Sequence, residues 1–172
     1  MTADERSLAR LATQVAERLA ADGLHIVTVE SCTGGLVAKL LTDIAGSSAW
    51  FDCGYVTYSN AAKQRDVGVQ AQTLLRHGAV SDAVVREMAE GALTRTGADI
   101  AVALSGVAGP AGGTARNPVG SVWIAVARRR GEGFDTLALL SRFVGDRDAV
   151  RRQAAGTALS RILRSLEQVD DA

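Results

Sequence analysis

The stretch Val29-Glu30-Ser31-Cys32-Thr33-Gly34-Gly35 decides the fold, because the hydrophobic pattern changes there. The apolar run at 25–29 is typical of a short buried strand, and the apolar spacing over 34–43 predicts a helix. A strand that turns sharply into a helix leaves the first backbone N–H groups of the helix without partners, beyond the edge of the sheet. Those donors and the helix dipole suit an oxyanion, a phosphate or a carboxylate.

This turn has two interpretations. Gly34 and Gly35 lack a Cβ, so a ligand can approach the backbone closely. Ser31 stands beside the electropositive helix start, where a nucleophile that attacks a carbonyl is needed. Alternatively, the turn is an ordinary strand-to-helix connection in which Ser31 or Thr33 caps the helix. The local sequence leaves both interpretations open.

The composition indicates a single globular domain over residues 1–172. Acidic and basic residues balance at 19 each, which argues against a nucleic-acid or other polyanion binder. The basic triplet Arg128-Arg129-Arg130 is expected to solvate a turn at the end of a strand. No apolar run approaches the ~20 residues that span a bilayer, and the first residues lack a signal-peptide pattern. We therefore expect a cytoplasmic protein without a membrane partner.

Cysteine and histidine are too sparse to predict a metal site. The chain has two cysteines (Cys32 and Cys53) and two histidines (His25 and His77), with no close grouping. In a cytoplasmic protein two cysteines are weak evidence for a disulfide. We expect catalysis without a metal.

The order of the predicted elements indicates the fold class. Helices are expected at 5–21, at 34–43, around Lys63, near 70–76, at 82–96 and at 147–167. Strands are expected at 25–29, 50–58, 99–105, 120–127 and 134–143, the last two as a hairpin around a turn at 128–133. Strands that alternate with helices predict an α/β sandwich, and the hairpin makes its sheet mixed.

A second glycine-rich loop follows the strand at 99–105. It contains Gly106, Gly109, Gly112 and Gly113, enough glycine for a backbone nest that binds an anion, although it could equally be a mobile surface loop. If the strands at 25–29 and 99–105 are neighbours, both glycine loops border one cleft. Neither loop has a dinucleotide-binding or Walker A spacing, so no NAD or ATP cofactor is expected.

A serine nucleophile needs a base, and lysine is the candidate. His25 begins a strand and His77 lies beside a helix-ending glycine, so neither is placed to serve Ser31. Lys39 lies in the helix after the turn, where it would be solvated, and Lys63 follows a strand end. Roughly one lysine in a few thousand is neutral at pH 7, so a Ser–Lys pair requires burial or a neighbouring cation. Lys63 could instead be a solvated helix residue.

Six motifs in order extend over nearly the whole chain: Glu30-Ser31-Cys32-Thr33-Gly34-Gly35, Gly54-Tyr-Val-Thr-Tyr-Ser-Asn60 with Lys63, Gly78-Ala-Val-Ser81, Ser105-Gly-Val-Ala-Gly-Pro110, Pro118-Val-Gly-Ser-Val-Trp123 and Gly145-Asp-Arg147. Together they resemble the CinA C-terminal domain family, whose members are nicotinamide-nucleotide amidohydrolases (NMN deamidases). The resemblance implies a three-layer α/β/α sandwich with a mixed, mostly parallel sheet, and self-association as a homodimer or higher homo-oligomer. It also implies hydrolysis of the carboxamide of nicotinamide mononucleotide (NMN) to nicotinic acid mononucleotide and ammonia, in pyridine-nucleotide salvage and NAD metabolism.

The same resemblance suggests site residues. Ser31 matches the nucleophile of the family and Lys63 its base, while Tyr58 could orient Lys63. Ser105 stands where members often have threonine, so a hydrogen-bonding hydroxyl is retained and a methyl is lost. Some members carry an additional N-terminal domain, and we expect only the amidohydrolase unit here.

In the expected mechanism, neutral Lys63 takes the proton of Ser31, and backbone N–H groups of Thr33, Gly34 and Gly35 stabilise the oxyanion. The glycine nest at 106–113 and Arg147 are candidates for the ribose phosphate, because a guanidinium fork fits phosphate geometry. Arg147 could instead cap a strand end or pair with Asp146.

Two rival hypotheses remain. One is a nucleotide-binding or regulatory module of the same fold that has lost catalysis. The other makes Cys32 the nucleophile, although a small buried residue is its simpler interpretation.

Overall fold

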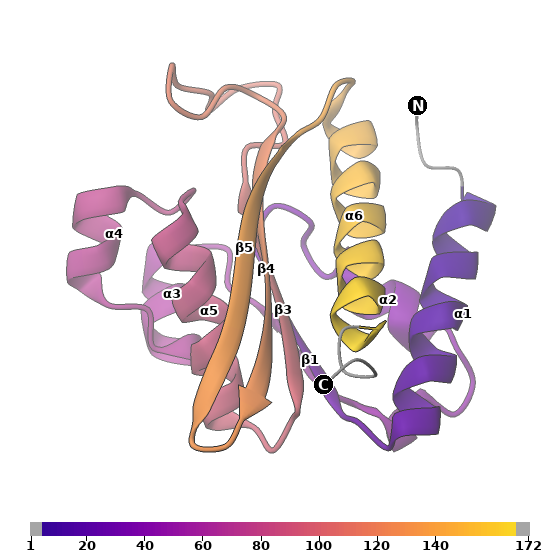
Figure 1. Ribbon diagram of the computed structural model, residues 1–172. Helices are drawn as coiled ribbons and strands as arrows, with labels where there is room; N and C mark the ends of the chain where they lie inside the picture. The colour runs from indigo at the N-terminus through magenta and orange to yellow at the C-terminus, as the bar shows by residue number, and fades with distance from the viewer. Residues whose placement is uncertain (1–4, 168–172) are drawn as a thin grey trace.

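Residues 5–167, the part of the chain that the computed structural model describes, alternate between helices and strands (Figure 1). In chain order the elements are α1 (Glu5–Asp22), β1 (Ile26–Glu30), α2 (Leu36–Thr42), the 3-10 turn η1 (Ser47–Ala49), β2 (Phe51–Val56), α3 (Asn60–Val67), α4 (Ala71–His77), α5 (Asp82–Arg95), β3 (Ile100–Gly106), β4 (Ser121–Arg130), β5 (Gly133–Arg142) and α6 (Arg147–Glu167). Every element expected from the sequence is present, which confirms the α/β class.

One mixed sheet lies between two helical layers. Its strand order is β2-β1-β3-β4-β5; β2, β1 and β3 are parallel, and β4 and β5 add antiparallel pairs. Figure 1 shows α1, α2 and α6 on one face of the sheet and α3, α4 and α5 on the other. This is the three-layer sandwich that the family resemblance implies. None of the helices described is long and apolar enough to cross a membrane.

The central strands are apolar throughout because helices cover both of their faces. On β3, the large residues Ile100, Val102 and Leu104 pack into the core beneath α1 and α6. Ala101 and Ala103 point to the opposite face and pack beneath α5. This alternation of large and small side chains lets α5 lie close to the sheet on the side where Lys63 is carried.

Most elements are within two or three residues of their predicted bounds, and two of the differences have a clear physical reason. Helix α2 begins at Leu36 rather than at 34, because Gly34 and Gly35 have φ values of 61° and 93°, outside the helical region. The turn expected at 128–133 is confined to residues 131–132, so the basic triplet belongs to β4 and not to a turn. Gly131, at φ 56°, provides the left-handed conformation that a two-residue hairpin turn requires.

Helix α3 is held against α5 by an unusually close approach of their backbones. A Cβ at Gly91 of α5 would lie 1.8 Å from the carbonyl oxygen of Val67, the last residue of α3. Ser59 caps the other end of α3 by accepting a hydrogen bond from the N–H of Ala62. Helix α3, which carries Lys63, is therefore capped at its start and packed closely against α5 at its end.

Candidate active site

Ser31 and Lys63, predicted to act together, are in contact. Ser31 follows the last residue of β1, where its N–H donates to the carbonyl of Leu104 on neighbouring β3. Lys63 lies in the first turn of α3, and its Nζ is 3.1 Å from the Oγ of Ser31 and 2.7 Å from the carbonyl oxygen of Thr57. The separation of amine and hydroxyl is within the range for proton transfer.

Burial changes the acid–base properties of Lys63. The side chain is only 1% exposed, so the interpretation of Lys63 as a solvated helix residue is wrong. Burial lowers the pKa of its ammonium group from the usual range, because the charged form loses its hydration; the nearby Cys32 thiol acts weakly in the opposite direction. A larger fraction of Lys63 is therefore the neutral amine, the form that can accept a proton.

The start of α2 is occupied by a carboxylate of the protein itself. Oε2 of Glu30 accepts from the N–H groups of Gly35 and Val37, and Oε1 accepts from the N–H of Ala38. The N–H of Gly34 donates to the Ser31 carbonyl. The prediction that the Gly34 and Gly35 N–H groups form the oxyanion site is therefore wrong, and so is that of Ser31 or Thr33 as the cap.

Two N–H groups next to the nucleophile remain without an acceptor in another residue of the 5–167 range, those of Cys32 and Thr33. Two hydroxyls in the same place, Oγ1 of Thr33 and of Thr57, are buried and have no hydrogen-bond partner among the described residues. Buried polar groups are normally paired. These are thus unpaired polar groups next to the nucleophile, and both threonines are 0% exposed.

The second glycine loop lies at the same edge of the sheet. Strands β1 and β3 are neighbours, with Glu30 paired to Leu104, as the cleft hypothesis requires. Gly109 and Gly112 have φ values of 85° and 89°, and the N–H groups of Gly109, Gly112 and Gly113 donate to no other residue within 5–167. Gly106 differs, because it is the last residue of β3 and a Cβ there would lie 2.6 Å from the Ser121 carbonyl oxygen. Gly106 therefore allows β3 and β4 to pack closely and is not part of the loop conformation.

Tyr58 and Arg147 contact each other. Nη2 of Arg147 donates to the Tyr58 hydroxyl at 2.8 Å, and Nη1 donates to the Gly109 carbonyl at the same distance. The amine of Lys63 is oriented by Thr57, the residue before Tyr58. Orientation of Lys63 by Tyr58 is therefore not observed. Arg147 instead joins the Tyr58 segment to the second glycine loop.

Ser105 does not reach the Ser31–Lys63 pair by a hydrogen bond. Its Oγ donates to the Ala79 carbonyl at 2.8 Å, and the side chain is buried. This bond ties the end of β3 to the segment before α5. Ser105 therefore holds the end of β3 in place and does not contact the Ser31–Lys63 pair through a hydrogen bond.

Arg151 is a site residue that the sequence reasoning missed. Its Nη2 donates to the Thr33 carbonyl at 2.7 Å and lies 3.6 Å from the position of a Cβ on Gly34. Residues four apart share one face of a helix, so the position of Arg147 on α6 could have indicated Arg151. Two arginines of α6 thus reach the loops that surround Ser31.

The two cysteines are free, and Cys32 is buried beside Ser31. Burial raises the pKa of its thiol to about 11. Within residues 5–167, no group of three His, Cys, Asp or Glu side chains is arranged to hold a metal ion.

Comparisons with known proteins assign the chain to a family. The family described as "CinA C-terminal domain" matches residues 8–166. "Nicotinamide-nucleotide amidohydrolase PncC" of Escherichia coli K12 is 56% identical over 155 residues, which cover 90% of this chain and 92% of the relative. The Pseudomonas putida protein of the same name is 48% identical over 153 residues, 89% of this chain and 93% of the relative. The crystal structure of "competence/damage inducible protein CihA" from Agrobacterium tumefaciens is similar, with a TM-score of 0.88 at 43% identity, over 94% of this chain and 96% of the other. The chain belongs to the CinA C-terminal domain family.

Proposed function

We propose that this chain is a nicotinamide-nucleotide amidohydrolase that hydrolyses the carboxamide of NMN to nicotinic acid mononucleotide and ammonia. The names of relatives at 48–56% identity support the substrate class. The observation that carries the mechanism is the 3.1 Å contact between the Ser31 hydroxyl and the buried amine of Lys63. No cofactor or metal is needed for this chemistry.

In the first step, the neutral amine of Lys63 accepts the Ser31 proton while Oγ forms a bond to the amide carbon. One N–H of the amine donates to the Thr57 carbonyl, which directs the lone pair toward Ser31. The tetrahedral intermediate then collapses, the C–N bond breaks, and the leaving nitrogen takes the proton back from Lys63. This step releases ammonia and leaves the nicotinoyl group esterified to Ser31.

In the second step, water replaces ammonia. Lys63, neutral again, accepts a proton from a water molecule that attacks the ester carbon. When the C–O bond to Ser31 breaks, Lys63 returns the first proton of the water to Oγ, and the new carboxylic acid loses the second proton to the released ammonia or to solvent as nicotinic acid mononucleotide leaves. The same base therefore serves both halves of the reaction.

The negative charge on the reacting oxygen needs donors that are not already used. The N–H groups of Cys32 and Thr33 meet this condition, whereas those of Gly34 and Gly35 do not. Removal of one such donor from an oxyanion site typically raises the activation free energy by ~3–4 kcal/mol. We assign the oxyanion site to Cys32 and Thr33.

The substrate phosphate fits the arginine side of the site. Glu30 already neutralises the start of α2, so a second anion would be repelled there. Arg147, Arg151 and the N–H groups of Gly109, Gly112 and Gly113, which donate to no other residue within 5–167, offer positive charge and donors. The phosphate is accordingly placed between α6 and the second glycine loop.

Cys32 is a poor nucleophile in this environment. With a pKa of about 11, roughly one thiol in ten thousand is ionised at pH 7, and the thiolate is the reactive form. The proposal retains Cys32 as a buried neighbour of Ser31.

The test is incubation of the protein with NMN, nicotinamide and nicotinamide riboside, with ammonia release as the measurement. We expect turnover of NMN and much slower release from the two substrates without phosphate. Binding of NMN without ammonia release would instead support a non-catalytic nucleotide-binding module.

A further inference from the structure

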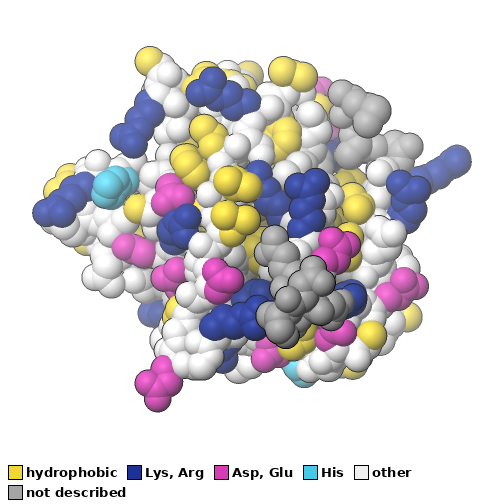
Figure 2. All heavy atoms as spheres, in the orientation of Figure 1, with side chains coloured by type: hydrophobic (Ala, Val, Ile, Leu, Met, Phe, Trp, Pro, Cys, Tyr) yellow, Lys and Arg dark blue, Asp and Glu magenta, His cyan; other side chains and the backbone are white. Residues whose placement is uncertain are grey.

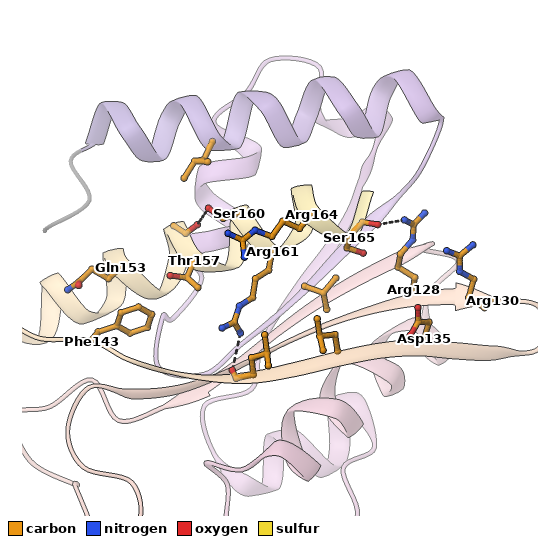
Figure 3. A pocket seen from close by; sticks show the side chains of 15 residues that line it. Arg128, Arg130, Asp135, Phe143, Gln153, Thr157, Ser160, Arg161, Arg164 and Ser165 are labelled. Carbon is orange, nitrogen blue, oxygen red and sulfur yellow. Dashed lines mark hydrogen bonds between the residues drawn. The ribbon is translucent and has the colours of Figure 1, made fainter. Parts of the chain in front are cut away.

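A second place on the molecule combines a cavity with unbalanced positive charge. The cavity has a volume of about 730 Å³ and lies between α6 and the β4–β5 hairpin, with Leu11 of α1 at its side (Figure 3). None of its lining residues belongs to the Ser31 site, which lies at the ends of β1 and β3. Cavities of this size hold small organic ligands in other proteins.

The apolar wall exists because α6 does not cover the outermost strand. Leu137 and Leu139 of β5 are 57% and 45% exposed, and both line the cavity together with Val126 and Phe143. Figure 2 shows hydrophobic and basic side chains together on the face where β5 lies in front. An occupant would therefore bury an apolar surface there.

The charged lining is strongly one-sided. Among the described residues that line the cavity, four arginines (Arg128, Arg130, Arg161 and Arg164) stand against one carboxylate, Asp135, so that this part of the lining has a net charge of +3. They crowd one another: burial lowers the pKa of the Arg161 guanidinium, and the charge of Arg164 adds to that effect. An anion would relieve this repulsion.

The four arginines divide into two fixed and two free groups. Nη1 of Arg161 donates to the carbonyls of Ile124 and Leu139 at 3.0 and 2.9 Å, and Nη2 donates to Oγ of Ser141. Arg128 donates to the Ser165 carbonyl. Arg130 and Arg164 are exposed, and their guanidinium groups make no hydrogen bond or ion pair with another residue of 5–167. The guanidinium groups of Arg130 and Arg164 are thus available to a ligand, whereas those of Arg128 and Arg161 already donate to the protein.

We propose that this cavity binds an organic anion, with its phosphate or carboxylate group on the guanidinium group of Arg130 or Arg164 and its apolar body against Leu137, Leu139 and Phe143. Both parts are required. A neutral ligand leaves the guanidinium groups unpaired, and an inorganic anion leaves the leucines exposed to water.

The probe for the test is 8-anilinonaphthalene-1-sulfonate, an aromatic anion whose fluorescence rises in apolar surroundings. We expect saturable binding to the wild type and a dissociation constant at least tenfold higher for the double variant Arg130→Gln/Arg164→Gln. The matched control is Arg10→Gln/Arg76→Gln, which removes two exposed charges elsewhere and should bind like the wild type. Arg147→Gln should also leave this binding unchanged, and hydrolysis of NMN by the Arg130/Arg164 variant should match the wild type.

Competition identifies the kind of anion. Adenosine monophosphate represents an aromatic phosphate and octanoate an aliphatic carboxylate; at least one should displace the probe, whereas adenosine and inorganic phosphate should not. Equal binding by the wild type and the Arg130/Arg164 variant, or displacement by adenosine as readily as by the anions, would overturn the proposal. So would absence of probe binding together with a sedimentation coefficient that falls in Leu139→Gln, because the face would then be a contact between copies of the chain.

Discussion

Two ionisable side chains are buried on opposite sides of Ser31, and they differ in how completely they are hydrogen-bonded. On the α2 side, the carboxylate of Glu30 accepts three backbone N–H groups, from Gly35, Val37 and Ala38. On the α3 side, the amine of Lys63 has one carbonyl, that of Thr57, and the hydroxyl of Ser31. The carboxylate is 1% exposed and so is the amine. Glu30 and Lys63 are thus equally buried, but the Glu30 carboxylate has more hydrogen bonds to the backbone than the Lys63 amine has.

The difference separates a structural charge from a reactive group. Three backbone N–H groups replace the water that the Glu30 side chain has lost, and these hydrogen bonds fix the turn. Lys63 has too few acceptors to replace its hydration, and burial lowers its pKa. The hydrogen bonds of Glu30 keep the turn after Ser31 rigid, while the amine of Lys63, which has fewer hydrogen-bond partners, can exchange a proton.

The largest effect is expected where the two sides meet. Ser31→Ala removes the atom that forms the covalent bond, so NMN turnover should fall by on the order of 10⁴-fold or more. Cys32→Ala, the neighbouring control, should stay within about tenfold of the wild type. Ammonia release measures both, with circular dichroism as the check of folding. The reverse pattern would transfer the nucleophile to Cys32.

Lys63 tests the reactive side. Lys63→Met retains the length and removes the base, and we expect a loss of about 10²–10⁴-fold, the usual contribution of proton transfer. In the wild type, kcat/KM should fall as the pH decreases through the pKa of Lys63, because the protonated amine cannot accept a proton. The midpoint should lie below the ordinary lysine value of about 10.4. A rate that does not change with pH over this range would exclude Lys63 as the base.

Glu30 tests the structural side. Glu30→Gln places one amide NH₂ where an oxygen now accepts backbone N–H groups, and the free energy of unfolding should decrease by about 2 kcal/mol. Urea unfolding of Glu30→Gln measures this change. Glu17→Gln, on the exposed face of α1, should be within about 0.5 kcal/mol of the wild type. If both variants were equally stable, the carboxylate would have no role in fixing the turn.

Arg151 offers the smallest and most specific change. Arg151→Ala removes the donor to the Thr33 carbonyl and one charge from the proposed phosphate site, and we expect kcat/KM for NMN to decrease about tenfold. The effect on nicotinamide riboside should be smaller, because that substrate lacks a phosphate. Arg152→Ala is the control, since Arg152 pairs with Asp148 on the surface. An equal loss for both substrates would mean that Arg151 only positions the turn.

Much of the fold could be predicted from the sequence, because apolar spacing and turn residues are local signals. The strands at 25–29 and 99–105 were recognisable as buried from their apolar runs, but that they are neighbours was only a condition of the cleft hypothesis, which the structure meets. The Ser31–Lys63 pair came from a motif resemblance, and its contact depends on α3 lying beside the end of β1. Local pattern alone could not give that contact.

Other features could not be predicted because they depend on how side chains fold back. Nothing in the order of residues indicates that Glu30 turns toward the start of α2 and occupies the N–H of Gly35, one of the donors predicted for the oxyanion. Arg151 meets Thr33 from 118 positions away in the chain. Tyr58 is next to Thr57, yet the backbone of one orients Lys63 while the hydroxyl of the other binds Arg147.

The close approach of α3 and α5 at Gly91 makes the geometry of the site depend on a residue outside it. Any side chain at this position would collide with the Val67 carbonyl, and α3 would have to move outward and take its lysine along. A shift of 1 Å would stretch the amine–hydroxyl separation past the limit for proton transfer, while the rest of the sheet stayed intact. Random mutagenesis that selects for inactive but well-folded protein should therefore recover substitutions at codon 91, far from any atom that meets the substrate.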